Sequence, residues 1–192
     1  MTKNRLEAFS DAVSAIILTI MVLELKIPHG SDWDALRPVS RHFPTYVLSF
    51  VYLGIYWNNH HHMLHATQRV NGSILWSNLH LLFWLSLVPF VTGWMGENKV
   101  APTPTALYGV VMLGAAIAYF ILQGAIVKHH GGPESALGRA IGRDVKGKIS
   151  LASYAASIPL AYVSRWISVA LFVFVAMLWL IPDRRIESTL DH

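Results

Sequence analysis

Arg5-Leu-Glu-Ala-Phe9-Ser10-Asp11 runs without a break into the apolar segment Ala12–Leu23, and this stretch decides the fold. Its charge-free core of twelve residues is shorter than the roughly 20 residues that a helix needs to cross a bilayer. The polar flank must therefore enter the membrane together with the apolar core. Charged groups at membrane depth usually face protein or water, because exposing them to lipid costs at least about 2.5 kcal/mol. We therefore predict a membrane helix that lines something other than lipid.

One face of this predicted helix is aliphatic. Ile16, Ile20, Leu23 and Ile27 follow one another at helical spacing and form a continuous stripe of branched side chains. The stripe has two interpretations that the pattern alone leaves open. It is either an ordinary surface that faces lipid or the protein core, or it is the wall of a pore that several copies of the helix surround.

The motif R-x-x-x-F-S-D, followed by A-x-x-x-T-x-x-x-L-E, resembles the signature of the transmembrane protein 175 family of potassium channels. The matching residues are Arg5, Phe9, Ser10, Asp11, Ala15, Thr19, Leu23 and Glu24. The resemblance implies six transmembrane helices per subunit and a homotetramer whose first helices line a central pore. It also implies a constriction of Ile16, Ile20 and Leu23 with Thr19 beside it, and moderate selectivity for potassium, the permeant ion. The sequence contains no T-V-G-Y-G-like loop of carbonyl donors.

The composition favours a helical protein that crosses the membrane several times. Of its 192 residues, 54% are hydrophobic and only 14% are charged, which is too apolar for an ordinary soluble domain. The absence of cysteine excludes disulfides and thiolate metal sites. The net charge of +4 is better explained by basic cytoplasmic loops than by nucleic-acid binding. We therefore predict an all-α, polytopic membrane protein.

Six apolar segments are predicted to span the membrane. They are Arg5–Ile27, Phe43–His65, Ile74–Met95, Thr105–Val127, Ile149–Val163 and Arg165–Ile181. Pro89 is expected to kink the third segment, because proline cannot donate a helical hydrogen bond. The last two segments lie so close together that a tight helical hairpin is expected. Residues 1–185 then form a single channel domain, and residues 186–192 form a C-terminal tail.

The distribution of basic residues predicts the orientation. If the N-terminus lies inside, ten of the 15 Lys and Arg residues fall in interior segments, as the positive-inside rule requires. Both termini are then cytoplasmic, and the resemblance implies the plasma (inner) membrane of a bacterium. The expected partners are the lipid bilayer, further copies of the chain and potassium ions, without nucleic acid.

A second motif contains Trp57, His60 and His61, and its W-x-x-H-H pattern resembles the family's partner motif on the second helix. Asp11 at membrane depth needs hydrogen-bond donors, which Arg5, an indole N–H or a histidine ring can supply. We therefore predict a structural network of Arg5, Phe9, Ser10, Asp11, Trp57, His60 and His61. Which histidine makes the contact does not follow from spacing. An interfacial cluster and metal ligation by this motif remain alternative interpretations.

Patterns typical of catalysis are absent from the sequence: there is no P-loop, no H-E-x-x-H motif and no nucleophile elbow. We therefore expect neither an enzyme nor a resident cofactor or metal. The alternative function is a histidine-rich membrane redox protein that binds metal or haem through His60, His61, His65 and His80. An ion-coupled transporter is a third, weaker alternative.

Overall fold

The structure, a computed structural model, describes residues 2–65, 67–132, 134, 138 and 144–180. Every regular element in this part of the chain is helical, which confirms the predicted all-α class. The elements are α1 (Lys3–Leu23), the short 3-10 helix η1 (Trp33–Leu36), α2 (Arg37–His65), α3 (Gly72–Ser86), α4 (Val88–Glu97), α5 (Pro102–His129), α7 (Val145–Val163) and α8 (Arg165–Leu180).

The predicted segments correspond to these helices with shifted ends. α1 stops at Leu23, four residues before the predicted end, where Glu24 is followed by charged and proline residues. α2 begins at Arg37, six residues earlier than predicted. The third predicted segment is interrupted at Leu87 and continues as α4, with Pro89 in the first turn of the new helix. Because Pro89 has no N–H to donate, the interruption falls where the proline requires it.

The expected hairpin of the last two segments is present. Only Ser164 separates α7 from α8, and its N–H donates to the carbonyl of Leu160. Across the hairpin, the Ser168 hydroxyl donates to the Ser157 carbonyl at 2.7 Å. The predicted tail, residues 186–192, lies outside the described residues.

Three helical segments in the described part of the chain are long and apolar enough to cross a membrane. They are α1, the interrupted pair α3–α4 (Gly72–Glu97) and α5, while α8 is apolar but shorter. α2 is long but carries a run of Asn and His residues near its C-terminus. Six transmembrane spans per subunit therefore remain a prediction.

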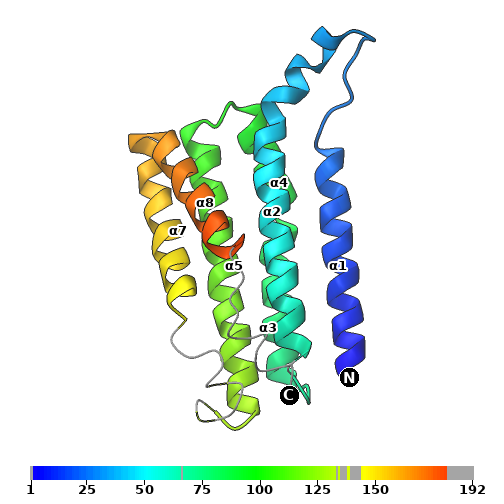
Figure 1. The fold of residues 1–192 in the computed structure, drawn as a ribbon, viewed down its shortest axis with the longest axis vertical. Coiled ribbons are helices and arrows are strands. Elements are labelled where there is room, and N and C mark those ends of the chain that lie inside the picture. Colours follow the sequence, from blue (N-terminus) through cyan, green and yellow to red (C-terminus); the bar gives the residue numbers. More distant parts are fainter. Residues whose placement is uncertain (1, 66, 133, 135–137, 139–143, 181–192) are drawn as a thin grey trace.

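The helices run side by side, with α1 at one edge and α5 near the middle (Figure 1). α5 contacts α3, α4, α7 and α8, whereas α1 contacts α2, α3 and α4. The start of α1 and the C-terminal ends of α2 and α5 lie at the same end of the molecule. Within the described part of the chain, the other helices cover only one side of α1.

The close approach of α3 to α5 depends on Gly114. A Cβ at this position would overlap the indole ring of Trp84, whereas a Cβ at Gly124 of the same helix would meet nothing within 4 Å. We expect Gly114→Ala to cost about 1–3 kcal/mol through overpacking and to lower the thermal midpoint by about 2–10 °C. Thermal unfolding in detergent measures the shift. The matched variant Gly124→Ala is expected to be neutral or stabilising, and equal midpoints for the two variants would contradict this packing.

Candidate functional site

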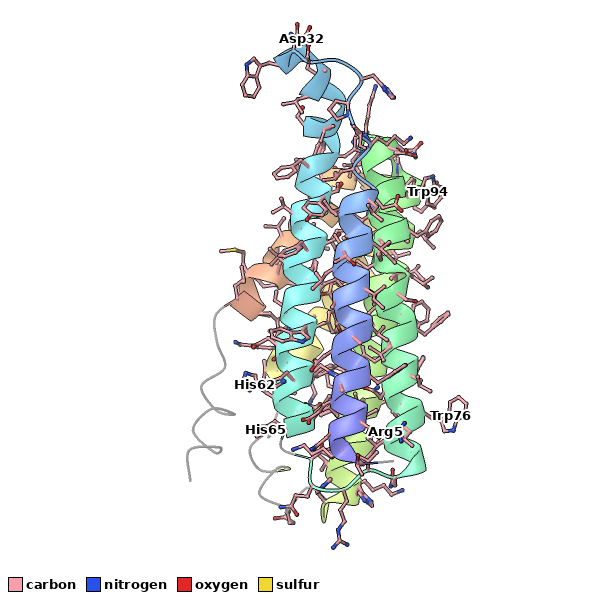
Figure 2. The ribbon with its side chains drawn as sticks, turned by 90° about the vertical axis from the view of Figure 1, so that its right-hand side faces the viewer. Arg5, Asp32, His62, His65, Trp76 and Trp94 are labelled. Atoms are coloured by element: carbon pink, nitrogen blue, oxygen red, sulfur yellow. The ribbon has the colours of Figure 1, made fainter. Side chains whose placement is uncertain are left out.

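α1 has two faces with different surroundings. Leu6, Ser10, Ile17 and Met21 recur at helical spacing and are buried against α2, α3 and α4. On the other side, Ile16, Thr19, Ile20 and Leu23 are exposed in the single chain. The exposed fractions are 56% for Ile16, 42% for Ile20 and 77% for Leu23. Figure 2 looks onto this side of α1, and no described helix lies in front of it. These residues of α1 are thus left uncovered by the described part of the chain.

A buried hydrogen-bond network fixes the inner face of α1. The side-chain amide of Asn78, on α3, donates to the Ser10 hydroxyl oxygen at 3.0 Å. The Asn78 carbonyl oxygen lies 2.6 Å from Nε2 of His60, on α2. Ser10 in turn donates to the Leu6 carbonyl at 2.9 Å. All three side chains at the centre of this network are buried, so that it joins α1, α2 and α3 in one set of satisfied polar groups.

A second contact joins α1 to α2 next to this network. The indole N–H of Trp57 donates to Oδ1 of Asp11 at 3.0 Å. The His61 ring stacks on Trp57 with centroids 5.9 Å apart, and the His65 ring follows at 6.2 Å from His61. The histidine that bonds the Ser10 network is therefore His60, whereas His61 lies on the exposed side of α2.

Two members of the predicted network lie elsewhere. Arg5 was expected to pair with Asp11, but no ion pair joins these two described residues. Arg5 is exposed near the start of α1 (Figure 2). Six positions along a helix turn a side chain by about 600°, which leaves the two side chains about 120° apart. Phe9 is also exposed, at 45%, and lies on the uncovered side of α1.

The residue that sequence reasoning missed is Asn78. It stands inside the apolar α3 helix and is fully buried. Its signal in the sequence is a single amide within an apolar run, because a buried amide must find hydrogen-bond partners. The neighbouring His80, by contrast, is exposed and accepts the indole N–H of Trp84 at 3.0 Å.

Among the four exposed residues Ile16, Thr19, Ile20 and Leu23, only Thr19 carries a side-chain oxygen. Its hydroxyl donates to the carbonyl of Ile16 at 2.8 Å. The hydroxyl proton is therefore used within the helix, and the oxygen lone pairs remain available on the exposed side. This arrangement presents an acceptor, which is the group that a cation can contact.

The C-terminal end of α1 is followed by an ion pair. Lys26 and Glu97, at the end of α4, form a salt bridge on the surface. The hydrogen bond and the charge of Glu97 raise the pKa of the Lys26 ammonium. The carboxylate of Glu24 lies against Gly93 of α4. A Cβ added to Gly93 would lie 2.7 Å from Oε2 of Glu24. These contacts hold the end of α1 against α4.

The alternative function as a metal or haem protein finds no support. Within the described ranges, no group of three or more His, Cys, Asp and Glu side chains is arranged to hold a metal ion. The His60 ring is bound to Asn78 and the His80 ring to Trp84. His61 and His65 are in ring contact on one helix.

These features define a helical membrane protein whose first helix is held by buried polar contacts on one face and left bare on the other. Residues 5–89 match the family model described as endosomal/lysosomal potassium channel TMEM175. A protein named as a potassium channel in Chryseobacterium sp. (strain P1-3) is 51% identical over 192 residues, which cover the whole of both chains. The chain belongs to the TMEM175 family, which is named for an ion channel rather than for an enzyme.

More distant relatives agree with this assignment. A protein named as a potassium channel in Chamaesiphon minutus is 27% identical over 186 residues, with 91% of each chain covered. The fold is similar to a crystal structure described as a lysosomal potassium-selective channel TMEM175 homolog from the same organism. The TM-score is 0.78 at 25% identity, over 93% of this chain and 96% of that one. The similarity therefore extends beyond the matched motif region to nearly the whole fold.

Proposed function

We propose that this chain is the subunit of a potassium-permeable channel, in which four copies turn their α1 helices towards a common axis. The observation that carries the proposal is the bare stripe of Ile16, Thr19, Ile20 and Leu23 on α1. Membership of the TMEM175 family and a relative named as a potassium channel along its whole length support it.

Contact with lipid alone would be unfavourable for this side of α1. Arg5 and Thr19 are exposed on it, and Asp11 is only half-buried beside it. Polar and charged side chains at membrane depth usually face protein interiors or water-filled cavities. Of the three candidate spans, α1 is also the least covered: 22% of its apolar window is buried, against 50% in each of the other two. Further copies of the chain around a water-filled axis would cover this side of α1 and would give its polar side chains contact with water.

In this proposal, Ile16, Ile20 and Leu23 form the constriction. Rings of aliphatic side chains supply no oxygen to replace the water shell of an ion, so that such a passage gates by dewetting. Potassium gives up its water more readily than sodium, so squeezing a partly hydrated ion favours potassium. The outward lone pairs of Thr19 add an oxygen contact next to the constriction. Selectivity of this origin is expected to be moderate.

The predicted orientation belongs to the same proposal. The interior segments would hold ten of the 15 basic residues, with both termini in the cytoplasm of a bacterial cell. The start of α1 and the ends of α2 and α5 lie together at one end of the molecule, which would then be the cytoplasmic end.

The test is the reversal potential of reconstituted protein under opposed potassium and sodium gradients. We expect the reversal potential to shift clearly from zero towards the potassium equilibrium potential without reaching it, as moderate selectivity requires. The mass of the particle in detergent, corrected for bound detergent, should correspond to four chains. A reversal potential near zero would exclude selectivity for potassium, and a monomer would exclude a pore built from α1 helices of several copies.

A further inference from the structure

Two adjacent histidines hold the loop between α2 and α3 against the end of α5. The ring of His130 receives the backbone N–H groups of Gln68 and Arg69, at 2.9 Å and 3.4 Å from its Nε2 atom. The ring of His129 contacts the side-chain amide of Asn71, with 3.1 Å between Nδ1 and Nδ2. These bonds span about 60 positions of sequence and lie outside the α1 network.

The partners of His130 determine its protonation state. Its Nδ1 atom lies 2.8 Å from the carbonyl oxygen of Ile126. A carbonyl only accepts, so Nδ1 carries the hydrogen. Nε2 faces two N–H donors from the loop and must therefore accept. A ring with one donating and one accepting nitrogen is neutral, because both nitrogens donate in the imidazolium form.

The same reasoning applies to His129 through the amide of Asn71. Asn71 is the N-cap of α3, and its side-chain oxygen accepts the N–H of Ile74 at 2.9 Å. That bond fixes which end of the amide is oxygen, so the NH₂ group points to His129. Nδ1 of His129 must then accept, and this ring is neutral as well.

We propose that His129 and His130 form a proton-released clamp, which holds residues 67–71 on α5 while both rings are neutral. A proton added to Nε2 of His130 or to Nδ1 of His129 places a donor opposite a donor, and the bond is lost. Both rings are in reach of protons, since His129 is exposed and His130 is half-buried. Their centroids are 5.4 Å apart, so that two charged rings would also repel each other.

The surrounding charges do not offset an added proton. The ionisable groups on the described segments that meet at this end include Lys128 on α5, Arg69 on the loop, His65 at the end of α2 and Glu134 beyond α5. The start of α1 adds Lys3, Arg5 and Glu7, of which Lys3 and Glu7 interact with each other at 3.9 Å. These groups comprise four permanent cations and two carboxylates.

Release of the clamp would free the loop that connects α2 and α3, the two helices whose polar side chains hold α1. The loop joins α2, which carries His60, to α3, which carries Asn78 and begins at the Asn71 cap. Acidification at this end of the molecule is therefore expected to loosen the loop and the first turn of α3. This loosening would be confined to the loop and the first turn of α3 and would not depend on ion permeation.

Amide hydrogen exchange of residues 67–74 in the purified protein tests the proposal. After correction for the intrinsic pH dependence of exchange, protection should fall at least about tenfold between pH 7.5 and pH 5.5, the range in which an ordinary histidine takes up its proton. The middle of α5 serves as an internal reference and should not change. Constant corrected protection of the loop across this range would overturn the proposal.

Three variants separate the clamp from a general effect of acid. His129→Asn with His130→Gln places amide oxygens near the accepting ring nitrogens and should make the loop insensitive to pH. His130→Lys presents a permanent donor and should expose the loop already at pH 7.5. His29→Gln removes a histidine at the opposite end and should keep the wild-type response. An unchanged pH response in the double variant, or a protected loop in His130→Lys at pH 7.5, would show that the histidines do not act as the clamp.

Discussion

Replacing Ile16 with asparagine is expected to bring the potassium-to-sodium permeability ratio of the reconstituted channel down to near one and to raise its leak. Ile16 is exposed on the bare side of α1, where the proposed constriction has no polar side chain to hold water. A ring of amides at this level would keep the passage wet and would contact sodium and potassium alike. Reversal potentials in mixed-ion gradients measure the permeability ratio. The background current at a fixed holding voltage measures the leak.

Val22→Asn is the matched control. Val22 is 48% exposed on the same helix, but it lies about 120° around the helix from Ile16. The same substitution there is expected to leave the permeability ratio several-fold closer to the wild type. Ile16→Val keeps the passage aliphatic and should retain selectivity. An unchanged ratio in Ile16→Asn, or an equal loss in Val22→Asn, would remove Ile16 from the constriction.

The second large effect is expected from Asn78→Leu, which removes the bridge between α1 and α2. The substitution leaves the buried His60 ring without its partner and removes the donor to the Ser10 hydroxyl, which keeps its own bond to the Leu6 carbonyl. An unsatisfied buried polar group costs about 1–3 kcal/mol and a lost hydrogen bond about 1 kcal/mol, so we expect a loss of about 2–4 kcal/mol in total. The thermal midpoint in detergent should fall accordingly, together with the yield of assembled protein.

Asn59→Leu controls for the substitution itself. Among the described residues, Asn59 donates to the Ile55 carbonyl of its own helix, at 2.8 Å, and bridges no second helix, so the loss of stability should be small. The triple variant Ser10→Ala, His60→Leu and Asn78→Leu makes the site apolar and should recover part of the stability, because no group is left unsatisfied. If Asn78→Leu were no less stable than Asn59→Leu, the network would not be what holds α1.

Much of the fold could be predicted because it follows from local properties of the chain. The apolar runs predict the helices, Pro89 predicts the interruption after Ser86, and the single residue Ser164 predicts the α7–α8 hairpin. Helix ends were less predictable. α1 stops at Leu23 although the aliphatic pattern continues to Ile27, because the end of a helix depends on what the following residues contact.

The candidate site could be predicted only in part. The sequence pointed to Ser10, Asp11, Trp57 and His60 as polar groups that need partners, and the structure brings these side chains together. It did not show that Asn78 is the bridge. Arg5 was paired with Asp11 on the basis of charge, although the two side chains lie on different sides of α1.

The sequence by itself determined that the chain is helical and apolar, that α1 carries an aliphatic stripe, and that its polar groups cannot face lipid. These properties follow from composition and from the 3.6-residue period of a helix. The tertiary structure decided which face of α1 is covered and which donor meets which acceptor. Ser10 and Asn78 are 68 residues apart in the chain, and only the packing of α1 between α2 and α3 brings them within hydrogen-bonding distance.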